Sequence, residues 1–291
     1  MKEVTVNVNG QITDGNSATV PALDHGFLFG EGIYETLRTY NHRPFLLARH
    51  LDRLRASADG IGLSVPLTDQ EFSERIEETM AQSDVTIERY IRLLITRGVG
   101  ELNYDPLACK EPTIVIIVKP HPETTDDILQ RGIKIVVSSV LRNHPRSVNP
   151  RIKSNNLLNN ALAMQEALRN GADEALMRNH RGEIAECAQA NFFIIREGEA
   201  ITPSLEAGLL EGVTRNFLFE VGRAIGVSVR SDVLHDSDLE IADEMFITSS
   251  TREILPVTMI DGRLIGEGLP GPVTQNLASA FRRKADQLTR S

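Results

Sequence analysis

One lysine stands where an amine could do chemistry. Lys153 lies among asparagines in the stretch NPRIKSNNLLNNALAMQEA, whose second half has the spacing of an amphipathic helix while its first half does not. Most lysines are solvated surface residues, but this chain has only six lysines in 291 residues. The others lie in terminal elements, in a loop or at strand ends, and only Lys153 lies at a loop-to-helix junction. We therefore expect a reactive amine there.

Three further stretches carry residues suited to holding an anion. LLEGVTRN places Val213 and Thr214 at the start of a predicted helix, where free backbone amides and the helix dipole favour phosphate. ITSSTRE ends a predicted strand in hydroxyl residues that include Ser250 and Thr251. Arg53 lies in RHLDRLRASA, and arginine suits bidentate phosphate contacts. Taken singly, these stretches could equally be an ordinary helix start, a capped turn and a surface arginine.

An acidic residue completes the set. Glu186 precedes a very apolar predicted strand in GEIAECAQANFF, and a buried carboxylate is costly unless a cation pairs with it. Pyridoxal 5′-phosphate would use all of these groups: a lysine amine for its aldehyde, amides, hydroxyls and an arginine for its phosphate, and a carboxylate for its pyridine nitrogen. The conjunction of the four features predicts this cofactor, although no single feature does.

These residues must be positioned by a mixed α/β chain. The N-terminal part is expected to form a hairpin, a glycine-punctuated loop, the strand IYETLRTY and a helix from about Ala48 to Ala58. Thr68 and Glu71 form a capping-box pattern for a second helix. Farther along the chain, a helix is expected to open at Gly212 and to end near Gly226.

Two domains are expected from the change in composition along the chain. The polar segment PHPETTDDILQRG separates two apolar regions and reads as a linker. We expect an N-terminal α/β domain over residues 1–120, a linker over 121–131 and a larger cofactor-binding domain over 132–291.

Composition and charge exclude several classes. Hydrophobic content of 41% and charged content of 24% are typical of a soluble globular protein. The net charge of −9 argues against a nucleic-acid or anionic-membrane partner, and no apolar run approaches the length of a membrane span. The two cysteines lack metal-ligand spacing, and MKEVTVNVNG alternates like a strand rather than a signal peptide. A cytoplasmic protein without a metal site is expected.

Four other polar residues are expected to have structural roles. His25, in DHGFLFG, is expected to fix its loop by a hydrogen bond. Cys187 is expected to be a small packing residue rather than a nucleophile. Arg215 and Arg252 are expected to pair with nearby carboxylates.

The sequence resembles the class IV aminotransferases, which are the fold-type IV pyridoxal-phosphate enzymes. The motifs that carry the resemblance cover nearly the whole chain and stand in the family's order: DHGFLFGEGIYETLRTY, HLDRL, KSNNLLNNALAMQEA, GADEAL, GEIAECAQANFF, LLEGVTR, SSTREILPVTMID and GEGLPGPVT. The resemblance implies a smaller N-terminal α/β domain, a larger C-terminal domain, the cofactor in the cleft between them and at least a homodimer.

The resemblance also implies a role for each candidate residue. Lys153 would form the Schiff base with the cofactor and shuttle protons, and Glu186 would pair with the pyridinium nitrogen. The phosphate would be held by Arg53, by the amides of Val213 and Thr214, and by the region of Ser250.

On the substrate side, the resemblance is greatest to the branched-chain amino acid aminotransferases. RYIRLLITRGVGELNYDP contains the Tyr-Ile-Arg triplet that lines the substrate in that group, here Tyr90 and Arg92. The remaining substrate-side candidates are Phe29, Tyr34, Arg38 and Thr251.

Two departures from family patterns bear on the subgroup. The D-amino-acid group carries an Arg-x-His carboxylate clamp after TRG, whereas this chain has Leu102, Asn103 and Tyr104 there, so the clamp is missing. Branched-chain enzymes usually carry a tyrosine five residues after the lysine, whereas this chain has Leu158. The first departure favours the branched-chain group and the second weakens it.

The expected activity is transfer of an amino group from a branched-chain L-amino acid to 2-oxoglutarate, in amino-acid biosynthesis. Arg92 or Arg38 would receive a carboxylate. The expected assembly is a homodimer or higher homo-oligomer, with the loop from Gly98 to Pro106 completing the partner's site. A D-amino-acid aminotransferase and an aminodeoxychorismate lyase are the alternatives. A non-catalytic binding module is disfavoured because Lys153 and Glu186 are both present.

Overall fold

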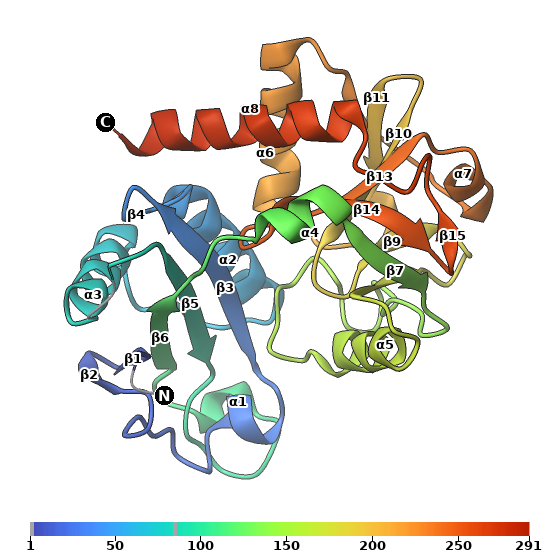
Figure 1. The fold of residues 1–291 in the computed structure, drawn as a ribbon. Coiled ribbons are helices and arrows are strands. Elements are labelled where there is room, and N and C mark those ends of the chain that lie inside the picture. The colour runs from blue at the N-terminus through green and yellow to red at the C-terminus, as the bar shows by residue number, and fades with distance from the viewer. Residues whose placement is uncertain (1–2, 84–85, 291) are drawn as a thin grey trace. The chain divides into compact units, whose positions relative to one another are not determined.

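The chain folds into two compact units, each with its own sheet and hydrophobic core (Figure 1). The structure, a computed structural model, describes residues 3–83 and 86–290. The mixed α/β class predicted from the sequence is confirmed.

The chain passes between the two units more than once. The first unit extends to Pro122, and the second begins at Glu123. Residues 152–156 then return to the first unit, a crossing that the expected boundaries of 1–120 and 132–291 do not include. The segment expected as the linker, 121–131, contains a short helix, α4 (Asp126–Arg131), which Thr125 caps.

The first unit is built on a six-stranded antiparallel sheet in the order β2-β1-β6-β5-β3-β4. The two longer helices, α2 and α3, bury alternate residues of β3, β5 and β6 on one face of this sheet. The elements are β1 (Thr5–Val8), β2 (Gln11–Asp14), α1 (His25–Leu28), β3 (Gly32–Tyr40), β4 (Arg43–Pro44), α2 (Leu47–Gly60), α3 (Asp69–Ala81), β5 (Arg89–Thr96) and β6 (Thr113–Pro120).

The local signals that predicted the helices of this unit are confirmed. Thr68 caps α3 by accepting from the Glu71 amide, and the Glu71 carboxylate accepts from the Thr68 amide at 2.7 Å. The helix expected over about Ala48–Ala58 is α2, which is one residue longer at its start and two at its end.

The second unit contains a nine-stranded mixed sheet in the order β12-β11-β10-β13-β14-β7-β8-β9, with β15 paired to β14. Three of its strand pairs are parallel and the others are antiparallel. Its elements are β7 (Ile133–Val137), α5 (Leu158–Arg169), β8 (Glu174–Arg178), β9 (Ile184–Cys187), β10 (Asn191–Arg196), β11 (Glu199–Pro203), α6 (Val213–Ile225), β12 (Val229–Asp232), α7 (Asp236–Glu240), β13 (Glu244–Ser249), β14 (Glu253–Ile260), β15 (Arg263–Leu264) and α8 (Pro272–Thr289).

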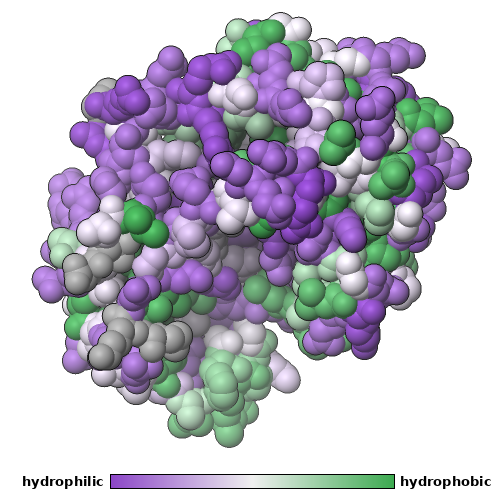
Figure 2. All heavy atoms as spheres, viewed as in Figure 1, coloured by the Kyte–Doolittle hydropathy of each residue, from purple (hydrophilic) through white to green (hydrophobic). Residues whose placement is uncertain are grey.

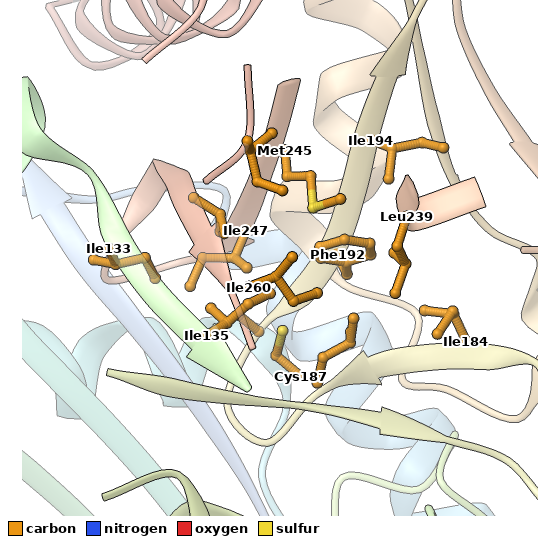
Figure 3. Close-up of a cluster of buried hydrophobic side chains, with 14 of the residues drawn as sticks. Ile133, Ile135, Ile184, Cys187, Phe192, Ile194, Leu239, Met245, Ile247 and Ile260 are labelled. Carbon is orange, nitrogen blue, oxygen red and sulfur yellow. The ribbon is translucent and has the colours of Figure 1, made fainter. Parts of the chain in front are cut away.

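Both faces of the central strands in this sheet are buried, which explains their continuous apolar sequences. On one face, Phe192, Ile247 and Ile260 belong to a cluster that also contains Cys187 (Figure 3). Figure 3 shows these side chains converging from several strands of the sheet. Cys187 is almost completely buried there, so its expected packing role is confirmed.

The helix predicted to start at Gly212 and to end near Gly226 is α6. Gly212 is its N-cap, and Gly226 adopts a left-handed conformation (φ 74°) as its C-cap. Glycine adopts this conformation most readily, so Gly226 correctly predicts where α6 ends.

Candidate cofactor and substrate site

Lys153 lies on a short segment that is docked along the edge of β3. The Tyr34 amide donates to the Lys153 carbonyl at 2.9 Å, and the Asn155 amide donates to the Gly32 carbonyl at 2.8 Å. A Cβ added at Gly32 would lie 2.5 Å from Nδ2 of Asn155, so glycine permits this close approach. The Lys153 amide donates to Oγ of Ser57 on α2 at 3.1 Å. The backbone of the lysine is therefore fixed on both sides.

The amine of Lys153 lies over an aromatic ring that it shares with an arginine. Its Nζ is 4.5 Å from the centroid of the Tyr34 ring, and the guanidinium of Arg92 is 4.2 Å from the same centroid. Burial raises the pKa of the Tyr34 hydroxyl, and Arg92 opposes this effect only in part. Tyr34 therefore remains a neutral hydrogen-bond donor beside the amine.

A buried ionic network joins β3 to α2 on the opposite face of β3 from Tyr34. Glu35 is fully buried, and its carboxylate accepts two bonds from Arg53 and one from Nδ1 of His50, each at 2.7 Å. Burial alone would raise the pKa of Glu35, but Arg53 and His50 hold it well below its usual range. Burial is also the main cause that lowers the pKa of His50. Arg53, expected to contact a phosphate, is thus oriented by Glu35.

Four of the substrate-side candidates share the face of the sheet that α2 and α3 leave uncovered. In the antiparallel register, Thr36 pairs with Arg92 and Arg38 pairs with Tyr90, so Tyr34, Arg38, Tyr90 and Arg92 all project to this side. Arg38 is only 2% exposed, donates to the Thr39 carbonyl and lies over the Tyr40 ring. Arg92 therefore fits a carboxylate receptor better than Arg38 does.

Phe29, a fifth candidate, contacts the loop that follows β5. Its ring lies 5.1 Å from the ring of Tyr104 and 4.8 Å from that of His25. Nε2 of His25 lies 2.8 Å from the Glu101 carbonyl, so the loop-fixing role expected for His25 is confirmed. Asp24 beside it is fully buried and accepts from the hydroxyls of Thr96 and Thr113.

In the second unit, Glu186 is buried and paired, as its position before an apolar strand requires. Nε of Arg142 donates to its Oε1 at 2.8 Å, and Nδ2 of Asn191 donates to its Oε2 at 3.4 Å. Asn159 on α5 accepts from Arg142 in turn. Neither Arg142 nor Asn191 is predicted from the sequence as a partner of Glu186. The requirement for a cation beside a buried carboxylate pointed to some arginine but not to this one.

Asn191 connects Glu186 with the start of α6, where Val213 and Thr214 lie. Its Nδ2 also donates to the Leu210 carbonyl at 2.9 Å. A Cβ added at Gly212 would collide with Oδ1 of Asn191, so only glycine fits as the N-cap. Glycine offers no side chain to cap α6, and its first-turn amides remain suited to an anion.

Ser250 and Thr251 lie in the three-residue turn between β13 and β14, as expected from ITSSTRE. Nη1 of Arg252 donates to Glu174 at 2.6 Å, which confirms the carboxylate partner expected for Arg252. The corresponding expectation for Arg215 is wrong. Arg215 is a buried residue of α6, and its guanidinium donates to the Asn216 side-chain oxygen and the Pro203 carbonyl.

Comparison with known proteins identifies the family. Residues 32–260 match the family model described as amino-transferase class IV, and the chain therefore belongs to the class IV aminotransferases. It is a transaminase of this family, whose members use pyridoxal 5′-phosphate.

Individual relatives carry two different names. The chain is 37% identical to a Methanocaldococcus jannaschii protein that is provisionally named a branched-chain-amino-acid aminotransferase, over 95% of each chain. It is 33% identical to a D-alanine aminotransferase of Listeria monocytogenes, over 98% of this chain and 96% of that protein. The solved branched-chain amino acid aminotransferase of Escherichia coli superposes with a TM-score of 0.91 at 30% identity, over 96% and 93% of the two chains. The fold-type IV architecture is thereby confirmed.

The residues of each unit fit the family's cofactor. The second unit offers a buried carboxylate held by a guanidinium and an amide, beside helix amides that no N-cap side chain occupies. The first unit offers a lysine amine fixed at its backbone. Among the described residues, no cluster of histidine, cysteine and acidic side chains could hold a metal ion. No helix in the part of the chain that the structure describes is long and apolar enough to cross a membrane.

Proposed function

We propose that the protein transfers an amino group from a branched-chain L-amino acid to 2-oxoglutarate, with pyridoxal 5′-phosphate bound at Lys153. The observation that carries this proposal is the segment of Lys153, which holds the amine over Tyr34 beside Arg92. Both ends of this segment continue directly into the second unit, at Arg151 and Leu157. The lysine is therefore tethered within a few residues of the unit that carries Glu186.

The cofactor, when bound, supplies an aldehyde carbon that takes up the amino group and a ring that draws electrons from the substrate. We assign Glu186 to the pyridine N–H, which its carboxylate accepts and keeps protonated. The amides of Val213 and Thr214, the Ser250 region and Arg53 donate to the phosphate. Lys153 would hold the cofactor through its Nζ, and this amine would take the proton from the α-carbon of the amino donor and supply one to the α-carbon of the amino acceptor.

Arg92 is the group that we assign to the second carboxylate of 2-oxoglutarate. It lies on the face of the first sheet opposite α2 and α3, with Tyr34 and Tyr90. A guanidinium that lies over an aromatic ring can still donate two N–H groups to a carboxylate. The Tyr34 ring beside it and Tyr90 on the same face suit the apolar side chain of a branched-chain amino acid. Phe29, Arg38 and Thr251 remain proposed members of the substrate side.

A D-amino-acid aminotransferase is the second candidate, because relatives named D-alanine aminotransferase match almost as well as the others. Leu158, which stands at the position of the expected tyrosine, favours this reading. Leu102, Asn103 and Tyr104, which replace the Arg-x-His clamp, oppose it.

A half-reaction with a single amino acid distinguishes these activities. The purified protein is expected to show a visible absorbance band of lysine-bound cofactor, which L-leucine without an acceptor converts to the near-ultraviolet band of the amine form. Conversion by D-alanine and not by L-leucine would favour the D-specific activity, and conversion by neither would favour the lyase. Lys153→Ala is expected to lack the visible band, whereas Lys134→Ala, a lysine on β7, should retain it.

We also propose a homodimer. An exposed apolar patch lies on the first unit around α1 and the loop after β5, where Figure 2 shows hydrophobic residues gathered. Phe27 is 75% exposed and Leu107 is 85% exposed, which is unusual for such residues unless a partner covers them. This apolar patch consists of Leu23, Phe27, Leu28, Val99, Leu102, Tyr104 and Leu107. It includes the loop from Gly98 to Pro106 that we propose completes the partner's site.

A further inference from the structure

The residue that follows the turn of Ser250 and Thr251 has an unfavourable backbone conformation. Ser249 pairs with Glu253 across the hairpin, which leaves a three-residue loop between β13 and β14. Glu253 has a φ of +57°. Hairpins with three-residue loops usually place glycine at such a left-handed position, because a Cβ is crowded there. Glu253 must therefore be held by its side chain.

The side chain of Glu253 is buried and anchored to α8. Only 6% of the residue is exposed, and its carboxylate accepts from Nε of Arg282 at 2.7 Å. Arg282 also lies 3.7 Å from the carboxylate of Glu123. The first residue after the loop is thus fastened to α8, a helix that contributes none of the residues proposed to hold the cofactor or the substrate.

Arg252, the last residue of the loop, is anchored to a different element. Arg252 donates to Glu174 at the start of β8 at 2.6 Å and to the side-chain oxygen of Gln189 at 2.9 Å. Glu174 is fully buried, and its second oxygen accepts from the Ala175 amide. The amide of Arg252 donates to Oγ of Ser249 at 3.1 Å. Two ion pairs, made with β8 and with α8, therefore fix consecutive residues immediately after Ser250 and Thr251.

We propose that Glu174 and Arg282 are positioning residues for a phosphate-binding turn at Ser250 and Thr251. The inference rests on the proposed function, in which this turn holds the phosphate of pyridoxal 5′-phosphate. Neither residue touches the ligand. Glu174 holds Arg252 and Arg282 holds Glu253 in place before the ligand binds. The free energy of binding is then not spent on ordering the turn, which strengthens the affinity for phosphate.

A pair of ligands that differ only in the phosphate tests the proposal. The dissociation constants of the cofactor-free protein for pyridoxal 5′-phosphate and for phosphate-free pyridoxal are measured by absorbance. Arg282→Gln and Glu174→Gln are expected to weaken pyridoxal 5′-phosphate by about tenfold, the order of one side chain that must be immobilised on binding. Pyridoxal should bind these variants as it binds the wild type, because it makes no phosphate contact.

Two further variants separate positioning from stability. Glu253→Gly removes the anchor but suits a positive φ, so it is expected to lose phosphate-dependent affinity while keeping the melting temperature of the wild type. Arg282→Lys keeps a cation for Glu253 and should recover part of the affinity, and it replaces Arg282→Gln if that variant does not fold. Arg230→Gln, which breaks exposed ion pairs on β12, is the matched control and should bind both ligands normally.

The outcomes distinguish the inference from the function on which it rests. Variants that bind both ligands as the wild type does would overturn the positioning role, and so would an equal loss for the two ligands, which indicates a general loss of structure. A wild-type protein that binds pyridoxal 5′-phosphate no more tightly than pyridoxal would instead overturn the phosphate site itself. A wild type that binds neither ligand would overturn the proposed function.

Discussion

At the scale of single residues, Lys153 and Glu35 differ in how far the sequence reveals them. Lys153 is predictable because lysine is scarce and its position at a loop-to-helix junction is unusual. Glu35 lies in IYETLRTY between Ile33 and Leu37 on the apolar face of the strand, but the sequence does not show which cations would compensate a carboxylate there. Its partners, His50 and Arg53, come from the next helix, and the sequence does not show that the three side chains meet in the interior.

Glu35→Gln is expected to destabilise the folded protein and to change its response to acid. Breaking a buried ion pair costs about 3–5 kcal/mol of unfolding free energy. The pKa of Glu35 is depressed in the folded state, so the unfolded state binds the proton more readily and the stabilisation is lost as the pH falls below its ordinary value of 4.5. The deficit of the variant should therefore be complete at about pH 7 and narrow below about pH 4.5.

Urea denaturation of the cofactor-free protein across this pH range measures the effect. Glu74→Gln, at an exposed position on α3, is the control and should change the unfolding free energy little at any pH. A deficit that stays constant as the pH falls below the ordinary pKa of Glu35 would contradict the assignment.

The pKa of His50 gives a second, independent prediction for the wild type. Burial lowers it below its ordinary value of 6.5, so the unfolded state binds this proton more readily than the folded state does. The unfolding free energy contributed by His50 is therefore expected to fall as the pH decreases below about 6.5. His50→Gln should flatten the denaturation midpoints in that range. A wild-type protein whose urea denaturation midpoint does not change between about pH 7 and pH 5.5 would contradict the lowered pKa of His50.

Arg92→Gln is expected to act on one substrate of the two. A charged hydrogen bond to a carboxylate contributes about 1.5–3 kcal/mol, so the KM for 2-oxoglutarate should rise at least about tenfold. The KM for L-leucine should change little, because leucine has no second carboxylate. Steady-state kinetics with each substrate varied in turn measures the split, and Arg89→Gln at the start of the same strand is the control. Equal changes in the KM values for 2-oxoglutarate and L-leucine would show that Arg92 does not bind the second carboxylate.

At the scale of elements, local signals predict the helices well, but contacts distant in sequence escape prediction. The capping box at Thr68 and the glycines at either end of α6 act within one helical turn, so the sequence contains the whole signal. The docking of residues 152–156 along β3 joins segments about 120 positions apart, and no periodicity encodes it. The contact of Asn191 with Glu186 was missed for another reason, since an asparagine that opens a strand has many alternative roles.

Gly212→Ala is expected to disturb the cofactor site through Asn191. The added Cβ collides with the side-chain oxygen of Asn191, so this residue must shift away from Glu186 and from the start of α6. The dissociation constant for pyridoxal 5′-phosphate should rise by about tenfold or more, as when a polar contact to a ligand-holding group is lost. Gly226→Ala, at the opposite end of the same helix, should cost about 1 kcal/mol of stability without this loss of affinity.

Absorbance titration with the cofactor, paired with thermal melting, separates the two glycines. If both variants lose affinity in proportion to their loss of stability, Asn191 has no specific part in the site.

At the scale of the whole molecule, the exposed apolar patch predicts assembly more directly than composition does. Hydrophobic content alone is ordinary, and only the structure shows that Phe27 and Leu107 lie on the surface of the first unit. Phe27→Glu together with Leu107→Glu is expected to convert a dimer to monomers, because two charges would have to be buried at the interface. Light scattering during size-exclusion chromatography measures this, with Leu288→Glu on α8 as an exposed apolar control. A monomeric wild-type protein would contradict the proposal that the apolar patch is a dimer interface.

The return of residues 152–156 to the first unit means that the N-terminal part of the chain is not a self-sufficient module. A fragment ending at Pro122 would retain α2, α3 and the six-stranded sheet but would lose the segment that covers the first half of the free edge of β3. Its backbone groups would then be open to pairing with another chain. Recombination between relatives at the junction near residue 122 would likewise pair Tyr34 with a Lys153 segment from a different protein, so chimeras should exchange residues 152–156 together with the N-terminal part.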